Sequence, residues 1–368
     1  MKMVRHEIIS ESQKNNISFQ LATSEHAFDA VLFHNSYYGT ARSPKDWLWE
    51  YKTYKPDKSV FVFAKHADKI IATQGMLPIS VQCGKETIFC GKSESTLLLS
   101  EYRGTLLMQN LYEYAVGYCI EEGMQFIWGF TPAVKAFKKF GFESYKGVQI
   151  MVRRGNIWAG IRLKLRNRHP LWRRIASAGK LIVKHYLSRN NVTTNVFHGS
   201  SNYELRRGIT DETCLKALFS RLKLQNNSLI YIRYDQEYFK WRVRENPSIQ
   251  YTEYQVYNGN ELKAFAIVAL VRGILSISDL TSEDENAAAL LLQTILHDFS
   301  KIAAEYHILI NTQDILNQGV LKQLYKFKFS AGGTWNLVVR DLTKGKNKEI
   351  FDVRNWHING LWTEGYSM

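Results

Sequence analysis

The chain has 368 residues, of which 45% are hydrophobic and 13% aromatic, so it can bury substantial cores and does not belong to the disordered class. At roughly 100–200 residues per domain, this length favours two domains. The net charge is +14, and most of the excess comes from one internal segment rather than from the chain as a whole.

Targeting and metal-binding signals are missing from the sequence. The first residues, Met1–Glu7, are too polar for a signal peptide, and no apolar run approaches the roughly 20 residues of a membrane span. The cysteines show neither C-x-x-C spacing nor a pattern of histidine partners, which predicts free thiols and no metal site: Cys83, Cys90, Cys119 and Cys214. We therefore expect a cytoplasmic protein.

Residues 92–142 carry the clearest local pattern of the chain: a strand, a turn, a helix, a strand and a short helix. These predicted elements are, in order, Lys92–Leu99, Glu101–Thr105, a helix from Leu107, Gln125–Phe130 and Ala133–Phe140. The helix is predicted from apolar residues at helical spacing, Leu107, Leu111, Tyr114, Ala115 and Tyr118, and Gly123 lies where a helix end favours glycine. Since unpaired amides and the positive end of the helix dipole meet at the turn, it predicts a pyrophosphate site.

A strongly basic segment follows. Between Lys146 and Tyr203 there are twelve basic residues and no acidic residue, interleaved with Trp, Leu and Ile. Pro170 divides residues 153–189 into two predicted amphipathic helices. Two interpretations stay open, a solvated linker and peripheral contact with an anionic membrane surface. Nucleic acid ranks last as a partner, because no aromatic-glycine nucleic-acid motif accompanies the charge.

The second half of the chain echoes the first at an offset of about 190 residues. Trp47–Tyr51 followed by Pro56 corresponds to Phe239–Val243 followed by Pro247. Such an ordered echo argues for two copies of one fold. The sequence thus predicts an α/β protein with two mixed sheets flanked by helices, divided into an N-terminal domain (1–150), a basic linker (151–200) and a C-terminal domain (201–368).

The two halves differ at the turn. Where the first half has Glu101–Thr105, the second has Thr-Ser-Glu-Asp-Glu, in which Thr281 or Ser282 with Glu285 predicts a helix that caps itself. The three acidic residues there repel a pyrophosphate. We therefore predict that only the N-terminal half binds a nucleotide cofactor. The second half either shapes the neighbouring pocket or serves only as scaffold.

Polar and aromatic residues gather at the C-terminal end, between Asp352 and Tyr366. Chain ends are often frayed, so such a cluster indicates a tail that docks. If the tail folds between the halves, His357 or Glu364 is a candidate general base, and Trp356 and Trp362 are candidates to stack on a sugar ring. Docking for packing alone is the other interpretation.

The ordered set of strand, Glu101-Tyr102-Arg103-Gly104, helix, Trp128-Gly129-Phe130 and Lys139-Phe140-Gly141-Phe142 resembles the acetyl-CoA-binding core of the Gcn5-related N-acyltransferases, the GNAT superfamily. The usual loop of that family has the form (Arg/Gln)-x-x-Gly-x-(Gly/Ala). Here Leu106 and Met108 occupy the positions of the two motif glycines. An ordinary βαβ unit without a ligand is the competing interpretation. The resemblance implies a tandem GNAT acyltransferase that uses acetyl-CoA or another acyl-CoA.

The resemblance also implies where the site lies, between the strands Lys92–Leu99 and Gln125–Phe130. Backbone N–H groups near Leu98 and Leu99 would polarise the thioester carbonyl, and Thr131 would contact the pantetheine. The pyrophosphate would lie on Arg103, Gly104, Thr105, Leu106 and Leu107. The leaving-group tyrosine of the family falls at Phe137, which puts such an acid in doubt and leaves Tyr145 as a substitute.

Glu94 is the first candidate base. A carboxylate inside an otherwise apolar strand is costly unless it is paired or used, and burial would raise its pKa towards a useful value. A structural ion pair of Glu94 with Lys92 or Lys135 is the alternative.

The acceptor is predicted by resemblance alone. Relatives with this order of motifs resemble acyltransferases of bacterial surface-polysaccharide pathways, which implies a primary amine such as a nucleotide- or lipid-linked amino sugar. Two other classes stay open. One is a tandem aminoacyl transferase of the peptidoglycan-branching kind, which would use aminoacyl-tRNA and not need the CoA loop. The other is a non-catalytic binding protein. No oligomeric state is predicted.

Overall fold

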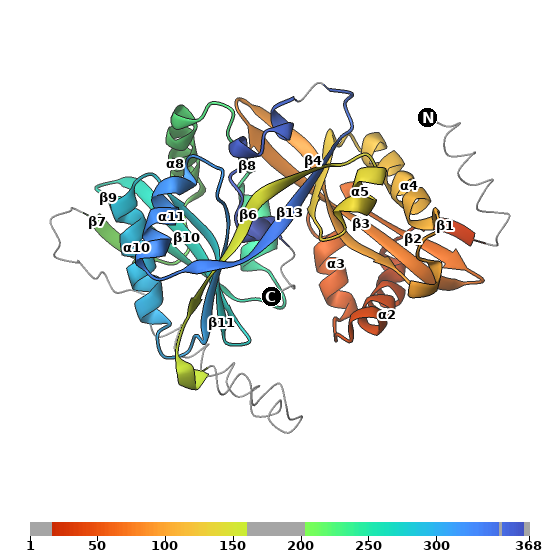
Figure 1. Cartoon of the computed structure of the whole chain (residues 1–368), viewed down its shortest axis with the longest axis horizontal. Helices are drawn as coiled ribbons and strands as arrows, with labels where there is room; N and C mark the ends of the chain where they lie inside the picture. Colours follow the sequence, from red (N-terminus) through yellow and green to blue (C-terminus); the bar gives the residue numbers. More distant parts are fainter. Residues whose placement is uncertain (1–16, 160–202, 346–347, 364–368) are drawn as a thin grey trace.

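One continuous mixed sheet forms the centre of the molecule. The computed structural model describes residues 17–159, 203–345 and 348–363, and within these ranges the sheet has 13 strands (Figure 1). The strands are β1 (Ile17–Leu21), β2 (Val60–His66), β3 (Lys69–Cys83), β4 (Glu86–Leu98), β5 (Phe126–Phe130), β6 (Glu143–Arg154), β7 (Tyr203–Arg207), β8 (Ile230–Ile232), β9 (Tyr251–Asn258), β10 (Glu261–Val271), β11 (Ile274–Ser282), β12 (Glu305–Asn311) and β13 (Ser330–Asp341). Their order along the sheet is β1-β2-β3-β4-β5-β13-β6-β12-β11-β10-β9-β7, and β8 pairs with β3. The predicted α/β class is confirmed, but one sheet replaces the two that were predicted.

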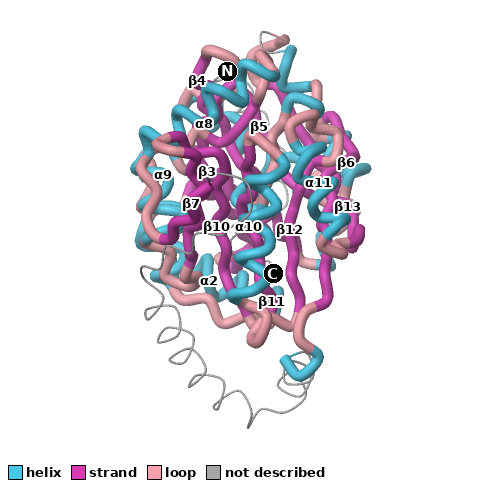
Figure 2. Tube along the Cα trace, turned by 90° about the vertical axis from the view of Figure 1, so that its left-hand side faces the viewer, coloured by secondary structure: helices cyan, strands magenta, loops and turns pink. Residues whose placement is uncertain are grey.

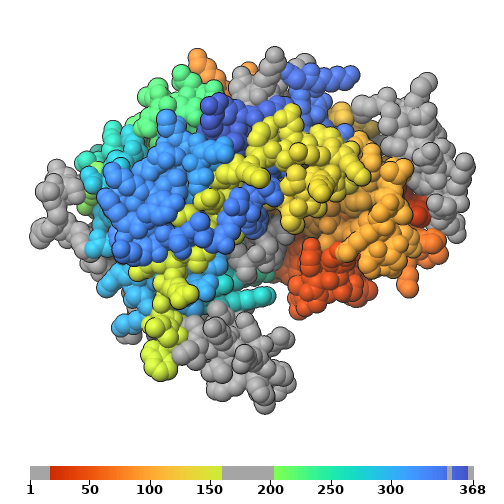
Figure 3. Space-filling view, viewed as in Figure 1, coloured from red at the N-terminus to blue at the C-terminus, as the bar shows by residue number. Residues whose placement is uncertain are grey.

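The two central strands explain why the sheet is continuous. β13 lies between β5 and β6, and β6 lies between β13 and β12, so each strand is inserted beside a strand of the other half. In Figure 3 the yellow surface of β6 crosses the middle of the molecule between orange N-terminal and blue C-terminal segments. An edge strand exposes unpaired backbone groups, and this exchange covers one edge of each half. The predicted domain boundary at residue 150 falls inside β6.

Helices cover both faces of the sheet and enclose three hydrophobic cores. In the N-terminal half, α4 (Leu107–Glu121) and α5 (Val134–Lys139) pack over one core. In the C-terminal half, α10 (Glu285–Asp298) and α11 (Asn317–Lys326) pack over a second, as the turned view of Figure 2 shows. The third core joins α2 (Ala27–Tyr38), α3 (Pro44–Lys52), α8 (Glu212–Gln225), α9 (Gln236–Phe239) and the C-terminal segment. Since this core contains residues of both halves, it ties them together.

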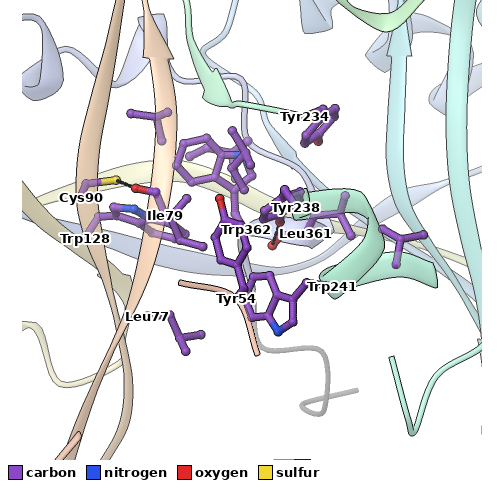
Figure 4. Close-up of a cluster of buried hydrophobic side chains, with 14 of the residues drawn as sticks. Tyr54, Leu77, Ile79, Cys90, Trp128, Tyr234, Tyr238, Trp241, Leu361 and Trp362 are labelled. Atoms are coloured by element: carbon purple, nitrogen blue, oxygen red, sulfur yellow. Dashed lines mark hydrogen bonds between the residues drawn. The ribbon is translucent and has the colours of Figure 1, made fainter. Parts of the chain in front are cut away.

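Aromatic side chains dominate the shared core. The indole of Trp49 donates a hydrogen bond to the carbonyl of Trp241 (2.9 Å), and the indole of Trp241 donates to the carbonyl of Trp49 (2.8 Å). These residues are 192 apart in sequence and come from the two echoed segments, which therefore face each other. Figure 4 shows Tyr54 stacked on Trp241, with ring centroids 4.8 Å apart, and Trp128 and Trp362 in the same cluster.

The local elements of residues 92–142 form as the sequence predicts. α4 begins at Leu107 and buries the predicted face through Leu111 and Ala115, and Gly123, with φ of +83°, follows its end. In the second half the helix cap differs from the prediction, because the Asp284 side chain, and not Thr281 or Ser282, accepts from the first amides of α10.

The described helices include none with the length and apolar composition needed to cross a membrane. The basic segment 153–189 lies outside the described residues from residue 160 onward. Peripheral membrane contact through it, like the cytoplasmic location, stays a prediction.

Candidate functional site

Two neighbouring strands separate in the middle of the N-terminal half. β4 and β5 run parallel and pair at Gly91 with Ile127 and at Lys92 with Trp128, after which they diverge. Beyond this point β4 bulges: Ser95 has a left-handed φ of +49°, and the register with β3 shifts there. Backbone groups that face the resulting fork lack a strand partner across it, so they are available to a ligand.

A cavity of about 380 Å³ lies at this fork. Its walls come from β4, the end of β5, β13 and the C-terminal segment: Lys92, Ser93, Glu94, Phe130, Thr131, Pro132, Thr334, Trp335, Asn336 and Thr363. Lys92, Ser93 and Glu94 are consecutive in a strand, and consecutive strand side chains point to opposite faces of the sheet. The wall of the cavity therefore includes strand positions from both faces of the sheet.

A buried ion pair forms part of the cavity wall. Glu94 and Lys92 are each 3% exposed, and their side chains pair with one another. The Lys92 ammonium lies 5.9 Å from the centre of the Trp128 ring, and Trp128 packs on Trp362 of the C-terminal segment with ring centroids 4.7 Å apart. Glu94 thus forms the structural ion pair with Lys92 that was the alternative to a role as base. It also lies in the cavity, where a base must lie.

The N-terminus of α4 is directed to solvent. The first backbone bond of the helix runs from the Asn110 N–H to the Leu106 carbonyl (2.9 Å), and the Leu107 N–H donates to the Thr105 hydroxyl (3.3 Å). Gly104 has φ of +83°, and a Cβ atom at this glycine would meet nothing within 4 Å. The Leu107 amide is thus already used, and the amides of Met108 and Gln109, with the open space at Gly104, are what the turn offers to an anion.

The predicted backbone donors are not equivalent. The Leu99 N–H donates to the Ile71 carbonyl of β3 (3.0 Å), so it is already used. Because successive N–H groups of a strand point to opposite edges, the Leu98 N–H points away from β3, on the side of the fork. Thr131 lines the cavity as expected. Of the two predicted donors, Leu98 and Leu99, only Leu98 therefore has its N–H on the side of the fork.

Two residues of the predicted cofactor set lie away from the cavity wall. Phe137 is 5% exposed and packs on Tyr112 in the core beneath α4 and α5, with ring centroids 5.6 Å apart. Arg103 lies on the exposed turn, where its guanidinium donates to the Tyr37 hydroxyl of α2 (2.9 Å). Phe137 is thus a core residue, whereas Arg103 keeps a position beside the α4 N-terminus.

Tyr145 and Glu364 gain no role from the structure. Tyr145 does not line the cavity, and its hydroxyl donates to the Glu143 carboxylate (2.7 Å). Burial, and then the hydrogen bond and charge of Glu143, raise the pKa of Tyr145, which makes it a weaker acid. Glu364 lies outside the described residues.

His357 belongs to a buried network of the C-terminal half. Its Nδ1 lies 2.8 Å from the Asp314 carboxylate, and its Nε2 lies 3.0 Å from the Thr281 hydroxyl. Since that hydroxyl donates to Asp279 (2.7 Å), it must accept from His357, so both ring nitrogens carry protons. Burial lowers the pKa of His357, but the bond and charge of Asp314, with the charge of Asp279, raise it overall. A ring with both nitrogens occupied and 4% exposure is not positioned as a general base.

The C-terminal half has a similar fork, and the chain itself covers it. β11 and β12 pair in parallel from Ile274 to Ile277 and then diverge, and the helical turn η7 (Gly360–Trp362) packs against both strands. A Cβ atom at Gly360 would lie 2.9 Å from the Ser278 Cα, so only glycine permits this approach. Asp279 stands two residues beyond the last paired residue, as Glu94 does, but it accepts from the Tyr234 hydroxyl (2.7 Å). The C-terminal segment therefore covers this fork.

Sequence reasoning missed the part of the cavity wall that comes from distant segments. Thr334, Trp335 and Asn336 lie on β13, which reaches the site only through strand exchange. The Thr131 N–H, just after β5, donates to the Asn336 carbonyl (3.1 Å). Thr363 is delivered by the C-terminal segment, where the Arg242 guanidinium donates to its carbonyl. The aromatic and polar composition of the tail was the one signal in the sequence that pointed to it.

The described residues contain no group of His, Cys, Asp and Glu side chains suited to a metal ion. All four cysteines lie within the described ranges, and none forms a disulfide.

The architecture matches solved structures, whereas no protein-family model and no curated protein matches the sequence. A GCN5-related N-acetyltransferase from Kribbella flavida superposes with a TM-score of 0.56 and 13% identity, over 89% of this chain and 72% of that one. The chain has the fold of the GNAT N-acetyltransferases. A second such enzyme, from Anabaena variabilis, gives a TM-score of 0.58 and 10% identity over 88% and 72%. The Saccharomyces cerevisiae N-myristoyltransferase with bound myristoyl-CoA gives 0.56 and 12% over 88% and 82%.

Proposed function

We propose that this protein is an acyl-CoA-dependent N-acyltransferase, most simply an acetyltransferase, built from two GNAT units with its active site in the N-terminal fork. The observation that carries this proposal is the cavity at the fork between β4 and β5, whose wall includes strand positions from both faces of the sheet. In this proposal the N-terminus of α4 binds the pyrophosphate of the cofactor. Glu94, in the cavity wall, faces the amine. Structural likeness to N-acetyltransferases and to a myristoyl-CoA-bound enzyme supports the same reaction class.

Each requirement of acyl transfer has a residue to meet it. The attacking amine must lose a proton, which Glu94 accepts, and the developing oxyanion needs a donor, which an unpaired backbone N–H of β4 at the fork supplies. The first-turn amides of α4 bind the pyrophosphate, and the missing side chain of Gly104 leaves room for it. The nitrogen bonds to the acyl carbon, and the carbon–sulfur bond then breaks with its electron pair left on sulfur.

The acceptor that best suits the cavity is a hydroxylated ring with a primary amine. The rings of Phe130 and Trp335 contact each other with centroids 5.5 Å apart and form an apolar surface, while Thr334, Asn336 and Thr363 supply hydrogen-bonding groups. Aromatic rings pack on sugar faces, and polar side chains around them bind hydroxyls. An amino sugar, nucleotide- or lipid-linked, is the acceptor class we propose.

The C-terminal half acts as the structural partner of the active half in this proposal. Its own fork is covered by the C-terminal segment, and Glu283 and Glu285 at the start of α10 pair with Arg221 and Lys322. The half contributes Trp335, Asn336 and Thr363 to the cavity instead of a second cofactor site.

Calorimetry with acetyl-CoA tests the proposal. We expect micromolar binding by the wild type and loss of binding in Gly104→Glu, which places a bulky anion where the pyrophosphate lies. Gly259→Glu is the matched control, because Gly259 also has a left-handed φ (+58°) and open space around it but lies in the β9–β10 turn. Equal loss in both variants would show a folding defect. No binding by folded wild type would refute the proposal, and salt-dependent binding of aminoacyl-tRNA would then identify the alternative.

A further inference from the structure

The hydroxyl of Ser93 has one proton with no short hydrogen bond. Its oxygen accepts from the Tyr112 hydroxyl (2.7 Å) and from the Gln74 amide (3.1 Å), which together use both lone pairs. The nearest remaining partner, the Thr96 hydroxyl, lies 3.5 Å away, beyond the ordinary range for two oxygens. Among the described residues, no contact therefore satisfies the Ser93 proton at normal length.

The neighbours of Ser93 fix this arrangement. The Gln74 amide nitrogen also donates to the Gly75 carbonyl (2.7 Å), and its oxygen accepts from Thr96 (2.7 Å), so the amide cannot turn round. Gln74 and Tyr112 are both fully buried, and burial raises the pKa of Tyr112 far above its ordinary value, so its proton stays on the oxygen. Ser93 is thus held as an acceptor on its buried side.

Ser93 stands where the fork between β4 and β5 begins. Ser93 is the first residue of β4 after its last pair with β5, and it lines the cavity. Across from it, a Cβ atom on Gly129 would lie 3.2 Å from the Ser93 Cβ, so glycine lets β5 approach the serine closely. A group bound in the cavity at this point would lie beside Ser93.

We propose that Ser93 donates a hydrogen bond to the sulfur of the bound thioester and stabilises the thiolate that leaves, with Tyr112 and Gln74 as positioning residues. This inference rests on the proposed function and assigns the leaving-group role that Phe137 cannot fill. When the nitrogen–carbon bond has formed, the carbon–sulfur bond breaks and its electron pair stays on sulfur. Glu94 holds the proton of the amine, Ser93 keeps its own, and the thiolate takes a proton from water after release.

The pKa of the thiol of bound CoA tests the inference without any acceptor. The ultraviolet absorbance of the thiolate is titrated in complexes of free CoA with the wild type, Ser93→Ala and Tyr112→Phe, and the same titration with desulfo-CoA is subtracted to remove the adenine signal. Ser100→Ala is the matched control, because this exposed serine lies outside the fork and bonds to Glu101. Affinity for CoA is measured alongside by calorimetry.

We expect the thiol pKa to be about one to two units lower in the wild type and in Ser100→Ala than in Ser93→Ala, with Tyr112→Phe in between. A packing defect alone would change affinity or stability but not this difference. Equal thiol pKa values in wild type and both site variants, with CoA bound, would overturn the role of Ser93 and leave the proposed function intact. Absence of CoA binding by the wild type would overturn the proposed function and this inference with it.

Discussion

The C-terminal segment should be essential for stability, and Trp362→Ala measures this. Trp362 is 0% exposed, and its ring packs on Trp128 and Trp356 with centroids 4.7 and 5.1 Å away. Truncation of a buried tryptophan to alanine costs about 3–5 kcal/mol. The indole N–H finds no hydrogen-bond partner among the described residues, so its removal relieves part of the cost and the lower end, about 3 kcal/mol, is expected.

The assay is denaturant unfolding of the wild type, Trp362→Ala and the matched control Trp158→Ala. Trp158 is 70% exposed, so the same truncation should change the free energy of unfolding by less than about 0.5 kcal/mol. Trp362→Ala should shift the midpoint without changing the slope, because the surface exposed on unfolding stays similar. A loss below about 1 kcal/mol for Trp362→Ala would refute the docked position of the tail.

Three further predictions follow from individual contacts. Glu94→Gln should lower the acylation rate by about 10²–10⁴-fold with acetyl-CoA affinity retained, measured with the best amine of an acceptor screen; an unchanged rate would exclude Glu94 as the base. Gly75→Ala should cost about 1–3 kcal/mol of unfolding free energy, since its methyl group would overlap the buried Tyr51 hydroxyl, whereas the open helical Gly117→Ala should not destabilise. Because the folded pKa of His357 is raised above 6.5 by Asp314, its stabilisation is complete below about pH 6.5 and is lost as pH rises through the folded value. Unfolding measured against pH should show this loss in the wild type, and the same slope in His357→Gln would contradict it.

The parts of the fold that the sequence predicted are those whose signals are local. The apolar stripe of α4 and the glycine after its end lie within one segment of chain, and so do the strand and short helix that follow. A helix needs only its own periodicity and caps to be recognised. Glu94 and Thr131, which the sequence singled out, both line the cavity, because each lies within or beside a strand of that same segment; their roles stay predictions.

The parts that escaped prediction depend on pairings between distant residues. Nothing in the sequence of β13 says that it pairs with β5, so Trp335 and Asn336 could not be assigned to the site. The role of His357 depended on Asp314 and Thr281, which occupy both ring nitrogens only after folding. Nothing in the sequence singled out Ser93, because its proposed role depends on the hydrogen bonds that Tyr112 and Gln74 donate to its hydroxyl oxygen.

The most direct measurement of the central claim is a crystal structure with a non-hydrolysable acetyl-CoA analogue. We expect the sulfur between β4 and β5, within hydrogen-bond distance of the Ser93 hydroxyl, and the pyrophosphate on the turn that includes Gly104. An analogue bound outside this fork, or in the fork of β11 and β12 with the C-terminal segment displaced, would contradict it.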